Sequence, residues 1–141
     1  YGAALILYSL GNDNYINILT QYLSRSNIEV INNKYVNPQL FTTFLTNDNP
    51  WIRINAANSL LALDKNNQKA LNTIIETLET DNIIVLSKAL NIIGQYGNLN
   101  EIPLVEKYLN DQSVRVRVSA SEALIRIFNR MDNTKSGAKD A

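Results

Sequence analysis

One pattern of apolar residues occurs three times in this sequence, at intervals of 33 and 31 residues. Counted from Ile52, Val85 or Val116, apolar or small residues recur at offsets +4, +7, +8 and +11. These offsets lie on one face of an α-helix. The first occurrence comprises Ala56, Ser59, Leu60 and Leu63, the second Ala89, Ile92, Ile93 and Tyr96, and the third Ala120, Ala123, Leu124 and Ile127. A helix repeated at this period predicts an all-α chain built as a superhelical array of helix pairs.

Each of the last two recurring helices is preceded by a second apolar stripe, which predicts the other helix of its pair. Asn66 and Asn67 come before the stripe Leu71, Ile74, Ile75 and Leu78, and Pro103 lies in the stripe Ile102, Val105 and Leu109. Near the N-terminus, Tyr15, Ile18, Leu19 and Tyr22 predict a helix that begins after Asn12–Asn14 and ends near Ser24. Gly11 and Gly97 each follow an apolar stripe, where a glycine in the left-handed conformation commonly ends a helix.

The pattern is irregular near residues 27–38. The stripe positions that follow Val30 are Lys34, Asn37 and Pro38, which cannot form an apolar face. We therefore expect a shortened helix from Asn27 to Tyr35 and a further helix with Pro38 in its first turn, ending near Thr46. Residues 132–141 lack apolar periodicity, so the sequence predicts a domain at 1–131 and a disordered tail at 132–141.

Residues 1–10 are apolar around most of a predicted helix, because Leu5, Ile6, Leu7, Tyr8 and Leu10 cover more than one face. Such a helix is normally buried from both sides. The chain opens inside this stretch, so we expect it to be a piece of a longer protein in which an upstream helix or domain covers the surface. Without that cover, we expect weak self-association through residues 1–10, as a two-fold dimer.

The composition argues against several classes of function. Thirteen basic residues balance thirteen acidic ones, which disfavours nucleic-acid binding. Histidine and cysteine are both absent, so imidazole-activated nucleophiles and Cys/His metal sites are excluded. No apolar run approaches the roughly 18 residues that cross a bilayer. No cofactor or metal is therefore expected; the compartment stays open, with the cytoplasm slightly favoured over the periplasm or the cell exterior.

The recurring units resemble the HEAT-like repeats, in which an Asp precedes the second helix and a Val/Ile-Arg pair opens it. Two segments carry the match: Asp48…Ile52-Arg53…Ala56…Leu60 and Asp111…Val116-Arg117…Ala120…Ala123-Leu124. The middle unit has Leu86 in place of the arginine. The resemblance covers about residues 1–131, most clearly from Asp48 onward. It implies a HEAT/armadillo-like solenoid of about eight helices, with an Asp–Arg ladder through the stack and the second helices on its concave side.

The concave surface implied by this resemblance is the candidate partner-binding site. On the second helices, the offsets +3, +6 and +10 fall outside the apolar stripe and are expected to be accessible. Besides Ala62 they are Asn55, Asn58, Lys88, Asn91, Gln95, Ser119, Glu122 and Arg126, a set rich in amides and almost uncharged. Hydrogen bonding to a peptide or an extended segment suits such a set. Trp51, the only tryptophan, is added as a possible hot spot, although packing over a helix end is the alternative.

Catalysis is not expected of this segment. The carboxylate pairs Glu76/Glu79 and Glu101/Glu106 have no nearby histidine, cysteine or glycine-rich loop. The sequence therefore favours a non-catalytic protein–protein interaction or scaffold module that binds a peptide or protein partner on the concave helix surface. The alternative is an accessory HEAT-repeat domain of a larger enzyme, of hydrolase or lyase type, with its catalytic residues outside these 141 positions.

Overall fold

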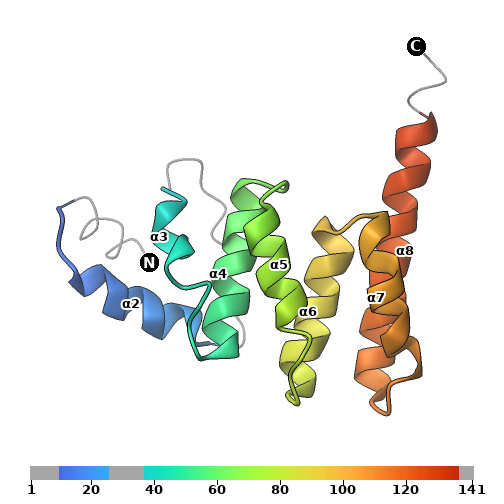
Figure 1. The fold of residues 1–141 in the computed structure, drawn as a ribbon, viewed down its shortest axis with the longest axis horizontal. Coiled ribbons are helices and arrows are strands. Elements are labelled where there is room, and N and C mark those ends of the chain that lie inside the picture. Colours follow the sequence, from blue (N-terminus) through green and yellow to red (C-terminus); the bar gives the residue numbers. More distant parts are fainter. Residues whose placement is uncertain (1–9, 26–36, 137–141) are drawn as a thin grey trace. The chain divides into compact units, whose positions relative to one another are not determined.

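All regular structure in the described part of the chain is helical, as the apolar periods predict. The computed structural model describes residues 10–25 and 37–136. Their helices, shown in Figure 1, are α2 (Asn14–Leu23), α3 (Gln39–Thr42), α4 (Pro50–Leu63), α5 (Gln68–Glu76), α6 (Ile83–Tyr96), α7 (Ile102–Glu106) and α8 (Val114–Ser136), with 3-10 turns η1 (Leu99–Glu101) and η2 (Lys107–Asn110). These seven α-helices are close to the predicted eight. The predicted helix over residues 1–10 and the short helix Asn27–Tyr35 lie outside the described residues, apart from Leu10.

The chain divides into two compact units, Tyr1–Thr77 and Leu78–Ala141. In the first unit, α4 packs against α2, α3 and α5. In the second, α8 packs against α6, α7 and η2. No helix in the described ranges is long and apolar enough to cross a membrane.

Asparagine side chains begin three of the helices. The Asn49 Oδ1 atom accepts a hydrogen bond from the Trp51 amide, at 2.9 Å, at the start of α4. Asn67 caps α5 and Asn82 caps α6 in the same way. Each cap satisfies an amide that has no partner inside its own helix. The asparagines that precede the apolar stripes therefore explain where these helices begin.

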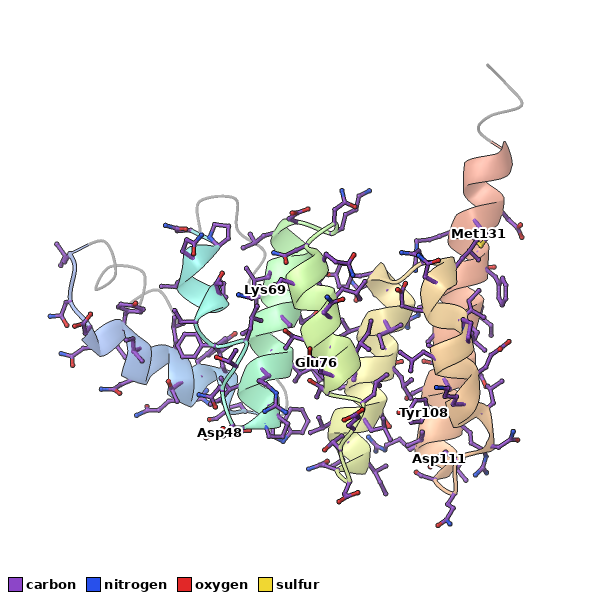
Figure 2. The ribbon with its side chains drawn as sticks, viewed as in Figure 1. Asp48, Lys69, Glu76, Tyr108, Asp111 and Met131 are labelled. Carbon is purple, nitrogen blue, oxygen red and sulfur yellow. The ribbon has the colours of Figure 1, made fainter. Side chains whose placement is uncertain are left out.

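Two arginines stabilise the turns before α4 and α8. The Arg53 Nη1 atom donates to the carbonyl oxygens of Asn47 and Asp48, at 2.6 and 3.0 Å. Arg117 makes the corresponding bonds, to the carbonyl oxygens of Asp111 and Gln112, at 2.8 and 3.1 Å. Figure 2 labels Asp48 and Asp111 in these turns. The structural role of the arginines is therefore as expected, but the bonds shown here go to backbone carbonyls within one turn.

The position equivalent to Asp111 is Asn47, which differs from the sequence alignment with Asp48. The Asp111 Oδ1 atom accepts from the amide two residues later, Ser113, and Asn47 does the same for Asn49. Thr80 takes this position before α6, where its hydroxyl oxygen accepts from the Asn82 amide. Side chains of three types thus form the same turn, because each places an acceptor two residues ahead of an amide.

Helices α6 and α8 of the second unit approach each other closely at Gly94 on α6. A Cβ atom at this position would lie 2.6 Å from the Ala123 Cα atom of α8. Only a residue without a side chain permits this approach. Arg130 of α8 also binds the end of α6, because its guanidinium donates to the carbonyl oxygens of Gly94 and Gly97 at 2.6 and 2.5 Å.

Gly11 and Gly97 require glycine for different structural reasons. Gly11 has a φ of 67°, the left-handed conformation that was predicted. Gly97 has an extended backbone, with φ −66° and ψ 167°, so the prediction of a left-handed stop was wrong there. Its Cβ atom would instead lie 2.6 Å from the Ile93 carbonyl oxygen. Gly97 is thus required by close packing at the end of α6.

The last helix is longer than the periodicity predicted. The predicted domain ended at Met131, with a disordered tail from residue 132, but α8 continues to Ser136. Once a helix is formed and packed, adding a residue fixes little more than its own backbone, so polar residues can extend it without an apolar face. Residues 137–141 lie outside the described part of the chain.

Candidate partner-binding surface

The predicted binding residues differ widely in their accessibility. Asn55 is 1% exposed, Asn58 7% and Ser119 6%, so the expectation that these three are accessible was wrong. Lys88, Asn91 and Trp51 are half-buried, while Gln95, Glu122 and Arg126 are exposed. The reason is plain on α4, which packs against three helices of its own unit and has almost no solvent-facing side.

Asn55 has a structural role within the first unit. Its Nδ2 atom donates to the carbonyl oxygens of Leu23 and Arg25, at 2.7 and 2.9 Å. These carbonyls lie at the C-terminal end of α2, where no helical amide follows to bond them. Asn55 therefore fastens α2 to α4.

Asn58 and Asn91 share an unusual feature. The Oδ1 atom of each is buried and has no hydrogen-bond partner. The two residues lie 33 apart, at the same repeat position of the helices α4 and α6. A buried acceptor without a donor costs about 1–3 kcal/mol, so such groups are rare in folded proteins.

Ser87 belongs with Asn91, although the sequence reasoning missed it. Its Oγ atom is likewise buried without a partner, and it lies one turn before Asn91 on α6. The available signal was the i, i+4 spacing of two polar residues in a strongly apolar helix. Gly94, which contacts α8, continues the same face. The second unit thus places two unsatisfied polar atoms on the edge of α6 that leads to α8.

The accessible members of the predicted set carry mixed charge. Glu122 and Arg126 are exposed, one turn apart, on α8. Burial lowers the pKa of the Lys88 ammonium, since desolvation disfavours its charged form. Gln95 donates from Nε2 to the Tyr96 hydroxyl, at 3.1 Å. The set has no dominant sign of charge, so it offers hydrogen bonds rather than electrostatic attraction.

The carboxylates considered for chemistry have other surroundings. Glu101 is buried, and its Oε2 atom accepts from the Asn98 amide at 2.6 Å in a capping box that begins η1. Glu76, Glu79 and Glu106 are exposed. Among residues 10–25 and 37–136, no group of three or more acidic residues is placed to hold a metal ion.

Comparison with protein-family models identifies a repeat family. The family model described as HEAT repeats matches residues 37–126, which is more than half of the chain. No curated protein and no solved structure matches it.

Proposed function

The chain belongs to the HEAT-repeat family, whose members commonly mediate protein–protein interactions, and we propose that it is a non-catalytic module that binds a peptide or protein partner. The proposed domain spans residues 1–131, extended by the end of α8. The binding surface is the concave side of the inner helices α4, α6 and α8. If the chain is an accessory domain of a larger enzyme, of hydrolase or lyase type, this binding role is the same and the catalytic residues lie elsewhere.

The unpartnered acceptors of Asn58 and Asn91 are the observation that supports this proposal most. Each acceptor lacks a donor, and a peptide in an extended conformation supplies one amide donor per residue. Asn91 is half-buried, and the terminal torsion of an asparagine side chain is soft, so its amide can turn toward an arriving partner. A cost of about 1–3 kcal/mol in the free protein is then recovered on binding. Because the acceptor recurs at the same repeat position, each of the two units offers one such acceptor to a partner.

The accessible residues favour the same class of partner. Lys88, Gln95, Glu122 and Arg126 combine one amide with charges of both signs. Such a surface gives little attraction for a polyanion, because nucleic-acid affinity depends on concentrated positive charge. It suits a mixed polar segment of a protein.

The experiment selects linear peptides from a random displayed library against the full chain and measures the affinity of the best one. Asn58→Leu and Asn91→Leu each remove an unpartnered acceptor at similar volume. We expect each variant to weaken peptide binding by about tenfold, or about 1.4 kcal/mol, while its melting temperature stays the same or rises. Asn17→Leu, on an exposed position of α2, is the matched control and should change neither quantity.

Two results would contradict the proposal. Undiminished affinity in both variants would move the site away from these acceptors. A lower melting temperature in parallel with lower affinity would mean that the asparagines are structural, as Asn55 is.

A further inference from the structure

Helix α8 has a second apolar face that the sequence reasoning did not identify. Val114, Val118, Ile125 and Phe128 lie along it and are between 48% and 64% exposed. The buried face of the same helix carries Val116, Ala120, Ala123 and Ile127. With Ser121 between them, the exposed residues are spaced four, three, four and three apart. This is the seven-residue spacing of helices that pair with another helix at a long, narrow seam. We call these five residues the α8 stripe.

The α8 stripe does not repeat the packing face of α6. The residues of α6 equivalent to Val118 and Ile125, 31 positions earlier, are Ser87 and Gly94. Gly94 admits Ala123 so closely that a single β-carbon would clash. An isoleucine in that position excludes such an approach, so the α8 stripe is not shaped to receive a further helix as α6 receives α8.

The extra length of α8 extends this face. Helices α4 and α6 each have 14 residues, whereas α8 has 23. Figure 1 shows α8 continuing past α7 toward the C-terminus. Phe128 lies at the position where α6 already ends in Gly97. The largest side chain of the stripe is therefore on a part of the helix that the earlier repeat lacks.

Ser121, the only polar member of the α8 stripe, can be buried in an interface without leaving its hydroxyl donor unsatisfied. The Ser121 hydroxyl donates to the Arg117 carbonyl oxygen of its own helix, at 2.9 Å. Its donor is thus already satisfied, and its small side chain lets a second helix approach at the centre of the stripe.

We propose that the α8 stripe binds the α8 stripe of a second copy of this chain, with the two helices antiparallel about a two-fold axis. In this arrangement Val114 lies opposite Ile125 of the other copy, and Val118 lies opposite Ser121. The contact is isologous, so every pair occurs twice and the assembly closes as a dimer.

Charge complementarity favours a second copy of the chain as the partner and an antiparallel orientation of the two helices. Arg115 and Glu122 are both exposed and border the stripe on the same side, each one residue after a stripe position. The antiparallel register brings Arg115 of each copy beside Glu122 of the other, which gives two opposite-charge pairs. A parallel pair in register would instead place the two Asp132 carboxylates, at the next stripe position, against each other. Like charges facing each other across a helix pair are destabilising.

The dimer should be weak. Four apolar side chains per copy are far fewer than the roughly 20–30 residues a side of a standard interface. We expect a dissociation constant on the order of 10–100 μM, which corresponds to about 5.5–6.8 kcal/mol.

Sedimentation velocity on the full chain over a concentration series tests the proposal. We expect a monomer–dimer equilibrium, and Ile125→Glu should shift it to monomer. Ile84→Glu is the matched control, because Ile84 is an exposed isoleucine of α6, 51% exposed against 57% for Ile125. It should leave the dimer unchanged. Far-UV circular dichroism checks that both variants fold.

A charge exchange tests the register. Arg115→Glu and Glu122→Arg should each weaken the dimer, and the two together should restore it, because the pairs re-form with their signs reversed. A chain that stays monomeric at millimolar concentration, or a double variant as weak as the singles, would overturn the proposal. So would a dimer abolished by Leu5→Glu but not by Ile125→Glu, since that result assigns association to the predicted surface at residues 1–10.

Discussion

Gly94 shows how one missing side chain sets the distance between two helices. Replacing glycine by alanine inside a helix normally stabilises it by about 0.5–1 kcal/mol. At Gly94 the added carbon would lie 2.6 Å from the Ala123 Cα atom and 2.9 Å from its Cβ atom. We therefore expect Gly94→Ala to lower the free energy of unfolding by about 1–3 kcal/mol, by overpacking. Urea denaturation measures this, and an increase in stability would show that α6 and α8 are not in tight contact.

Tyr108 provides a prediction of pH dependence. Its hydroxyl donates to the Leu78 carbonyl oxygen at 3.4 Å. Burial raises the pKa of this hydroxyl above its usual 10.0, and the negative charges of Glu79 and Asp111 raise it further. The unfolded chain therefore loses this proton first. The stability that Tyr108 contributes is complete below the unfolded pKa and is lost as pH rises through the folded pKa.

Comparison with Tyr108→Phe isolates this effect. Between about pH 9 and 11, the free energy of unfolding should fall more for the unmodified chain than for the variant. The advantage in stability that Tyr108 gives should therefore shrink as pH rises. Burial also lowers the pKa of Lys88, but this residue is present in both proteins, so its contribution to the comparison cancels. Parallel stability curves in chemical denaturation would show that Tyr108 ionises equally in the folded and unfolded chain.

The exposure of single side chains was the part that sequence could least predict. Periodicity assigned Asn55 and Asn58 to an accessible face, because a helix was assumed to bury one stripe. On α4, however, three neighbouring helices cover nearly the whole circumference, and Asn55 is used to bind α2. Which sides of a helix are covered depends on its neighbours in space, and no local pattern reports them.

At the scale of elements, the helix starts could be predicted more reliably than the helix ends. Starts have a local cause, an acceptor side chain such as Asn67 or Asn82 followed by an apolar stripe. Helix ends depend on packing and on how far an existing helix continues. Helix α7 ends at Glu106 and is followed by a 3-10 turn, whereas α8 continues through polar residues to Ser136. The α8 stripe could not be predicted from the repeat for a related reason: Val118, Ile125 and Phe128 lie at offsets +2, +9 and +12 from Val116, outside the recurring apolar pattern.

At the scale of the whole molecule, a repeat array is expected to respond locally to a change in any one unit. Each repeat depends mainly on its nearest neighbours, so stability is close to a sum of local terms. The two units allow a matched comparison, because in each unit one side chain donates hydrogen bonds to carbonyl oxygens at the C-terminal end of a helix. Asn55 does this for α2 in the first unit, and Arg130 does it for α6 in the second.

Amide hydrogen exchange on two variants tests this independence. Asn55→Ala should speed exchange in α2 by about 5- to 150-fold, because removing a bonded partner costs about 1–3 kcal/mol, and should leave α8 unchanged. Arg130→Met keeps the aliphatic stem but loses the guanidinium, so it should speed exchange at the end of α6 and leave α2 unchanged. If either substitution accelerates exchange equally in α2 and α8, the chain unfolds as a single cooperative body. In that case the stability of one repeat cannot be changed without changing all of them.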